Sequence, residues 1–131
     1  MNILVKISIF CCSKVTQKLG CSSTQCLCAL KNRIGAYSRH TRNAEVELVG
    51  LVNCPGCPSE IGPERLAKQI KNLAEYQVNE IYFSSCINTF CVFRYDYQAL
   101  IERDYPEVEV IFDAGRPHLP PIQIEFALQN N

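Results

Sequence analysis

The stretch EVELVGLVNCPGCPSEIGPERLAKQIKNLAEYQVNEIYF, residues 45–83, decides the fold. It begins with an apolar run over residues 45–52, rich in Val and Leu, of a length typical of a strand buried on both faces. Residues 63–76 have helical periodicity, and a second apolar run follows at residues 78–85. The helix has one apolar face, formed by Leu66, Ile70 and Leu73. A strand, a helix and a strand in this order predict two parallel strands joined by a right-handed crossover.

The same alternation continues on both sides of this unit. Strand-like runs occur at residues 2–10 and 108–112, and helical patterns occur at residues 24–33 and 95–105. The order βαβαβαβ predicts an α/β fold with three layers, in which helices cover both faces of a mainly parallel sheet of about four strands. We expect the flavodoxin/Rossmann-like arrangement, with the strand order 2-1-3-4.

Length and composition limit the classes of function. The 131 residues fit a single domain, residues 1–131, whose C-terminal tail, residues 115–131, adds an edge strand or runs along the surface. The 13 basic and 13 acidic residues cancel and are scattered, so we expect no nucleic-acid partner. No run approaches the ~20 apolar residues that span a bilayer, and no signal peptide is evident. We therefore expect a soluble, cytoplasmic protein without a membrane partner.

Nine cysteines are many for a chain of this kind. Thiols stay reduced in the cytoplasm, so cysteines there indicate metal binding or redox chemistry rather than structural disulfides. All nine follow the carboxyl ends of predicted strands, which share one edge of a parallel sheet. Those after the first strand are Cys11, Cys12, Cys21, Cys26 and Cys28; those after the second are Cys54 and Cys57; those after the third are Cys86 and Cys91. The sequence therefore predicts a cluster of thiols.

The pair Cys54-Pro55-Gly56-Cys57 gives this cluster a motif. A C-x-x-C turn lets one short loop supply two thiolates to one ion, and thiolates are the preferred ligands of zinc and of iron–sulfur clusters. The same spacing also occurs in redox dithiols.

The segment EVELVGLVNCPGCPSE, followed by a helix and by VNEIYFSSCI, resembles the CGGC-domain proteins of bacteria and archaea. The spacing from Cys21 to Cys26 is similar to the N-terminal cysteine pair of that family, and Cys11 matches the cysteine at the end of its first strand. The resemblance implies a metal-binding, zinc-binding role. The chain differs at Pro55, where the family has Gly, and at Val92-Phe93, where a Pro-His is expected, so it lacks a ligand histidine there.

Taken together, the loops and the resemblance predict seven metal ligands: Cys11, Cys21, Cys26, Cys54, Cys57, Cys86 and Cys91. Neighbouring strand residues face opposite sides, so only one of Cys11 and Cys12 points at the shared edge, and the resemblance favours Cys11. Cys21 and Cys26 are favoured over Cys28 as ligands, because Cys28 can face the core from its helix. His118 is a further candidate for a ligand or a proton-transfer group, whereas His40 is expected to be exposed.

The first hypothesis is thus a small metal-binding protein that holds zinc, with an iron–sulfur cluster as the alternative. The second is a thiol–disulfide oxidoreductase or sulfur carrier that uses Cys54 and Cys57. The third is an interaction module that needs its metal to fold. The sequence leaves open whether the protein is an enzyme, and which protein partner it has.

Overall fold

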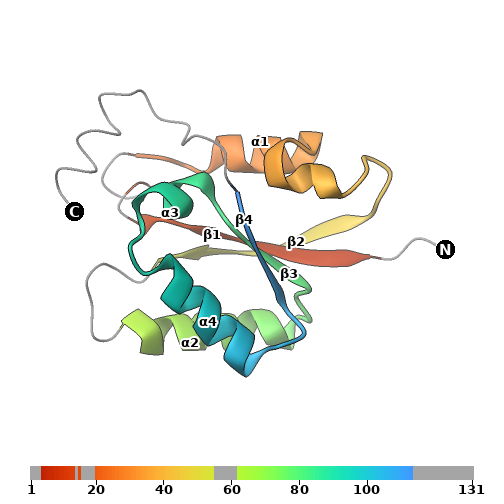
Figure 1. The fold of residues 1–131 in the computed structure, drawn as a ribbon. Helices are drawn as coiled ribbons and strands as arrows, with labels where there is room; N and C mark the ends of the chain where they lie inside the picture. The colour runs from red at the N-terminus through yellow and green to blue at the C-terminus, as the bar shows by residue number, and fades with distance from the viewer. Residues whose placement is uncertain (1–3, 14, 16–19, 55–61, 114–131) are drawn as a thin grey trace.

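A four-stranded parallel sheet forms the centre of the molecule (Figure 1). The structure is a computed structural model that describes residues 4–13, 15, 20–54 and 62–113. The strands are β1 (Val5–Cys11), β2 (Val46–Asn53), β3 (Glu80–Phe83) and β4 (Glu109–Phe112). Every neighbouring pair is parallel, and the order is β2-β1-β3-β4. The predicted strand order and direction are therefore confirmed.

Helices cover both faces of the sheet, as predicted (Figure 1). On one face lie α1 (Thr24–Asn32) and the 3-10 helix η2 (Gly35–Arg39). On the other lie α2 (Gly62–Glu75) and α4 (Arg94–Asp104). A short helix, α3 (Ser85–Phe90), follows β3 directly. The sequence patterns predicted α1, α2 and α4 but not η2 or α3, which are too short to show a helical period.

Each face of the sheet packs its own apolar core. The side chains of β1 alternate, because successive residues of a strand point to opposite faces. Ile7, Ile9 and Cys11 join the core beneath α1 and η2, and Phe10 and Cys12 join the core beneath α2 and α4. The predicted apolar face of α2 is buried in this second core through Leu66, Ile70 and Leu73. Each such side chain contributes about 1.5–3 kcal/mol when fully buried.

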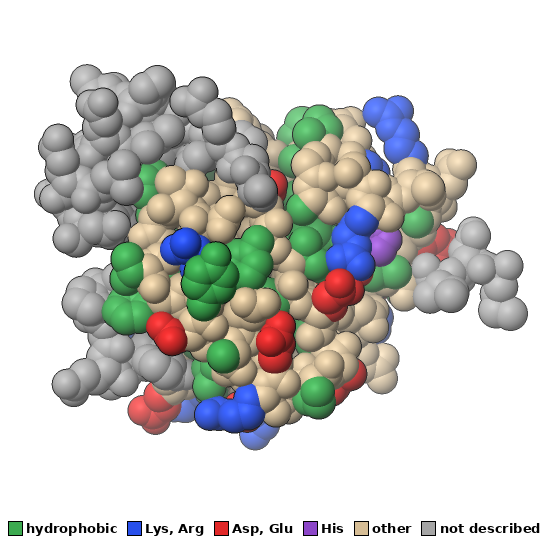
Figure 2. Space-filling view, viewed as in Figure 1, with side chains coloured by type: hydrophobic (Ala, Val, Ile, Leu, Met, Phe, Trp, Pro, Cys, Tyr) green, Lys and Arg blue, Asp and Glu red, His purple; other side chains and the backbone are tan. Residues whose placement is uncertain are grey.

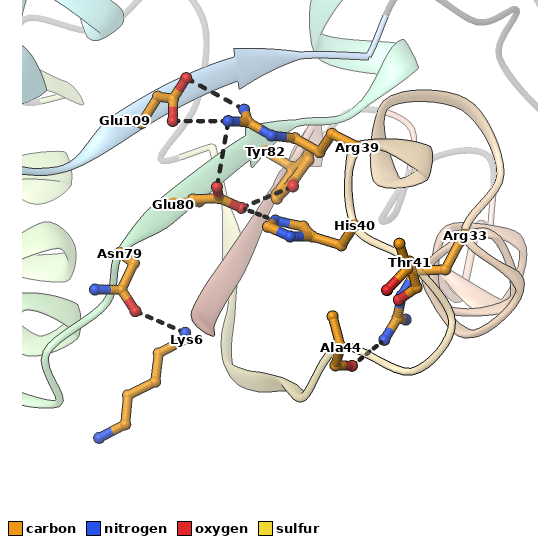
Figure 3. A network of polar contacts seen from close by, with 10 residues as sticks. All are labelled: Lys6, Arg33, Arg39, His40, Thr41, Ala44, Asn79, Glu80, Tyr82 and Glu109. Carbon is orange, nitrogen blue, oxygen red and sulfur yellow. Dashed lines mark hydrogen bonds and ion pairs between the residues drawn. The ribbon is translucent and has the colours of Figure 1, made fainter. Parts of the chain in front are cut away.

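A network of charged and polar groups occupies the amino edge of the sheet (Figure 3). Glu80, the first residue of β3, is buried, and one of its carboxylate oxygens lies 2.8 Å from both His40 Nε2 and the Tyr82 hydroxyl, which donates to it. Arg39 lies 3.6 Å from the other oxygen and makes two hydrogen bonds to Glu109. The expectation that His40 is exposed is therefore wrong, since this contact holds η2 against β3.

The surface in Figure 2 shows basic and acidic side chains interspersed, with apolar side chains between them. None of the helices in the described ranges is long and apolar enough to cross a membrane. The C-terminal tail, with His118, and the loop with Cys57 lie outside the described residues.

Candidate thiol site at the carboxyl edge of the sheet

Cys11 and Cys26 belong to one packed group of side chains at the opposite, carboxyl edge. Cys11 is the last residue of β1, and only 3% of it is exposed. Cys26 is the third residue of α1, which packs over the same face of the sheet. Cys26 packs against the core cluster that contains Cys11. The packing of α1 on β1 therefore joins two thiols that lie fifteen positions apart in the chain.

A tight turn before α1 adds a third cysteine. Ser23, the residue that precedes α1, has a positive φ of 63°, in the left-handed region that a non-glycine residue adopts only at some cost. In this conformation its Oγ lies 3.6 Å from the Cys11 sulfur, while its backbone N–H donates to the Cys21 sulfur at 3.4 Å. Ser23 thus links Cys21 to Cys11.

A second serine connects the loop after β3. Ser84 Oγ lies 2.9 Å from the Cys86 sulfur and also forms a hydrogen bond with Cys11. The backbone N–H of Cys12 donates to the same Cys86 sulfur at 3.4 Å. Ser84 itself follows β3, next to the end of β1, because its N–H donates to the Phe10 carbonyl at 3.0 Å. Two separate loops therefore bring Cys11, Cys21, Cys26 and Cys86 to one edge.

The contacts give these thiols different acidities. The hydrogen bond from Cys26, helped by those from Ser23 and Ser84, lowers the pKa of Cys11 from 9.0 to about 7 against the opposing effect of burial. The same shared proton, with burial and the charge of Cys11, raises the pKa of Cys26 strongly. Burial raises the pKa of Cys86 to about 11. Cys11 is therefore the thiol of this group that ionises near neutral pH.

The remaining cysteines lie around this group in different ways. Cys54 is buried after β2, and its N–H donates to the Cys11 carbonyl at 2.8 Å, so the C-x-x-C loop begins beside the end of β1. Cys91 is buried in the core beneath α4, after α3. Cys28, the less favoured candidate, does not face the core: it is exposed, and Asn32 donates to its sulfur. The expected division of Cys11 and Cys12 between opposite faces is confirmed.

Sequence patterns missed four polar residues near these thiols. They are Ser23, Ser84, Tyr37 and Asp113. Tyr37 is buried, and its hydroxyl finds no hydrogen-bond partner within the described ranges. Burial first, and then the charges of Cys26 and Asp113, raise the pKa of Tyr37. The one signal in the sequence for these polar residues was a serine directly beside a strand end that is rich in cysteines. Tyr37 lies on η2, which no pattern predicted.

Soft thiol sulfurs suit zinc or an iron–sulfur cluster, so the donor chemistry of this edge fits a metal. The geometry supplies part of a site. Within the described part of the chain, no three cysteine, histidine or carboxylate side chains are grouped so that they could hold a metal ion. The Cys11–Cys26 pair would thus need further thiols to complete a coordination sphere.

Parallel strands with helices on both faces and several cysteines at the carboxyl edge of the sheet define a cysteine-rich α/β protein. The family model described as the CGGC domain matches residues 6–114, and the chain belongs to the CGGC-domain family. A search of curated proteins and a search of solved structures gave no match.

Proposed function

We propose that this protein binds a soft metal ion, zinc, through cysteine thiolates at the carboxyl edge of the sheet. The observation that carries the proposal is the convergence of Cys11, Cys21, Cys26 and Cys86 from two separate loops, joined by two serines. A scattered set of buried cysteines would serve only as small apolar residues.

The acidity of Cys11 supports a ligand role. A metal binds the thiolate, so a thiol with a pKa of about 7 is available near neutral pH at little cost. The pKa of its neighbour Cys26 is raised, so this thiol keeps its proton in the metal-free protein, and metal binding would release that proton. Affinity should therefore rise with pH.

The rest of the coordination sphere is a proposal from the sequence. Cys21 and Cys86 lie one serine away from Cys11. Cys54 starts beside the end of β1, and Cys57, outside the described residues, is its partner in the C-x-x-C motif. Cys91 completes the predicted set. Four thiolates complete the coordination of zinc, a metal without redox chemistry, and an iron–sulfur cluster would use the same sulfurs.

Two cysteines of α1 provide a matched test. The protein is purified without oxygen, its metals are quantified and its absorption spectrum is recorded. Cys26→Ser should lose most of the bound metal, because a hydroxyl is a poor ligand near neutral pH. Cys28→Ser, two positions away on the exposed side of the same helix, should retain it. Equal metal content in both variants would contradict the proposal, and a visible charge-transfer spectrum would assign iron–sulfur instead of zinc.

The competing function is thiol–disulfide exchange or sulfur transfer at Cys54 and Cys57, for which the C-x-x-C spacing is the support. Replacing both with Ser separates the two functions. Loss of metal favours the metal site, whereas retained metal with lost disulfide exchange favours the oxidoreductase.

A further inference from the structure

We propose that Ser84 is a positioning residue of the metal site. Its hydroxyl holds the Cys86 sulfur in place and donates a hydrogen bond to it when that sulfur binds the metal as a thiolate. Because Cys86 is one of the proposed ligands, this role rests on the proposed function. Ser84 acts through the ligand and not on the metal itself.

Two groups from separate parts of the chain approach the Cys86 sulfur. The Ser84 hydroxyl oxygen lies 2.9 Å from it, and the backbone N–H of Cys12 donates to it at 3.4 Å. Ser84 follows β3, whereas Cys12 follows β1, the neighbouring strand of the sheet. The ends of two adjacent strands therefore fix the position of this sulfur.

The Ser84 hydroxyl does not serve the helix that it precedes. Serine is a preferred N-cap residue because its side-chain oxygen accepts a hydrogen bond from the first turn of a helix. Ser84 is the N-cap residue of α3, yet among the described residues its side chain makes no such bond. The hydroxyl is thus left for the Cys86 sulfur.

Burial makes this contact important for both groups. Ser84 is 1% exposed and Cys86 is 8% exposed, so the hydroxyl must find its partner within the protein. A neutral thiol can itself donate to the hydroxyl, but a thiolate has no proton, so there the hydroxyl donates. Hydrogen bonds to an ionised group are about twice as strong as those between neutral groups. The contact therefore becomes stronger when Cys86 binds metal.

The backbone of Ser84 is held independently of its side chain. Its N–H donates to the Phe10 carbonyl at 3.0 Å, and its carbonyl accepts from the Asn88 N–H at 3.0 Å. Neither bond uses the hydroxyl, so Ser84→Ala removes the contact with the sulfur and keeps the chain in place. Residues that hydrogen-bond to metal ligands orient them, and their loss typically lowers metal affinity about 10–100-fold.

The test measures the zinc affinity of the full chain, by competition with a chelating dye, and the absorption of its cobalt(II)-loaded form. Ser84→Ala should bind zinc about 10-fold more weakly than the parent chain. Its sulfur-to-cobalt charge-transfer absorption should move to longer wavelength, because a sulfur that loses a hydrogen bond gives up its electrons more readily. A purely structural role for Ser84 would not move this absorption.

Three further variants isolate the hydroxyl. Ser84→Thr keeps it and should retain the affinity and the spectrum, whereas Ser84→Val introduces a side chain of the same shape without the hydroxyl and should behave as Ser84→Ala. Ser85 is also buried but makes no hydrogen bond to a sulfur within the described ranges, so Ser85→Ala should match the parent chain. Circular dichroism confirms that each variant is folded; if Ser84→Ala is not, the comparison of Ser84→Thr with Ser84→Val decides the outcome.

The outcomes separate this role from the metal site as a whole. Equal affinities and spectra in Ser84→Ala and Ser85→Ala would overturn the role of Ser84, while cobalt absorption by the parent chain would still support the metal site. Retention of the metal by Cys86→Ser would also overturn it, because the sulfur beside Ser84 would then not be a ligand. A parent chain that takes up neither zinc nor cobalt contradicts the proposed function itself, and the role of Ser84 fails with it.

Discussion

The two edges of the sheet carry opposite kinds of polar chemistry. At the amino edge, the buried Glu80 carboxylate is contacted by His40, Tyr82 and Arg39 (Figure 3). At the carboxyl edge, the thiols of Cys11 and Cys26 differ in acidity, and they lie near a tyrosine whose hydroxyl has no partner within the described ranges.

This difference separates a structural role from a chemical one. A buried network whose hydrogen bonds are made holds η2 on the sheet, and its contribution to the stability of the fold is lost when one partner is removed. An incompletely balanced group of thiols gains by taking up a ligand or by losing electrons. The comparison therefore motivates two proposals: the amino edge stabilises the fold, and the carboxyl edge binds metal.

The largest expected effect is on metal content, and it is tested with one variant at each edge of the sheet. Replacing Cys11 and Cys26 together with Ser should reduce bound metal nearly to background, because two thiolate ligands are lost. Glu80→Gln should leave the metal content unchanged, since Glu80 lies at the other edge. Metal analysis of both variants checks the prediction; equal losses would show that the edges are not functionally separate.

Glu80→Ala should produce the largest loss of stability, about 3 kcal/mol, because it leaves the Tyr82 hydroxyl and His40 without their buried acceptor. Urea unfolding measures the change. Glu107→Ala removes an exposed carboxylate and serves as the control, with an expected change near zero. If both variants unfold at the same urea concentration, the amino edge does not stabilise the fold as assigned.

A smaller effect concerns pH and comes from the carboxyl edge of the metal-free protein. The pKa of Cys11 is 9.0 in the absence of perturbation and about 7 in the folded chain, so folding favours its thiolate. This contribution is complete above about pH 9 and is lost as the pH falls through 7. The raised pKa values of Cys26 and Cys86 act in the opposite sense, removing stability as the pH rises beyond 9.

We therefore expect the free energy of unfolding of the metal-free protein to rise by about 1–2 kcal/mol from pH 7 to pH 9. Urea unfolding across this range measures the rise, and Cys11→Ser should remove it. A rise of the same size in Cys11→Ser would assign the dependence to another group.

Arg39→Ala should have the smallest effect, about 0.2–1 kcal/mol, even though the guanidinium reaches both Glu80 and Glu109. The Arg39 side chain is 37% exposed, so solvent screens its ion pairs. Thermal unfolding at low and high salt checks the prediction. A loss comparable to that of Glu80→Ala would mean that the salt bridges, rather than the buried hydrogen bonds, hold this edge.

The fold followed from local patterns, whereas the contacts of the site did not. Apolar runs and the face of Leu66, Ile70 and Leu73 were enough to predict a parallel sheet with helices on both sides. The approach of Ser23 and Cys26 to Cys11 depends on how α1 packs over β1, which no spacing in the sequence states.

The amino edge was missed for a related reason. Glu80 lies within an apolar run, and a charge in such a run is a signal for a buried partner. Its partner Arg39 ends a short 3-10 helix, which has no period to recognise, and His40 directly follows that helix, so the network could not be assembled from the sequence.

The most direct test of a thiolate metal site is the spectrum of the protein loaded with cobalt(II) in place of zinc. Tetrahedral cobalt bound by thiolates gives intense sulfur-to-metal charge-transfer absorption. We expect this absorption in the parent chain and in Cys28→Ser, with a marked decrease in Cys26→Ser. A spectrum without thiolate charge transfer, or one that Cys26→Ser leaves unchanged, would contradict the assignment of the carboxyl edge as the metal-binding site.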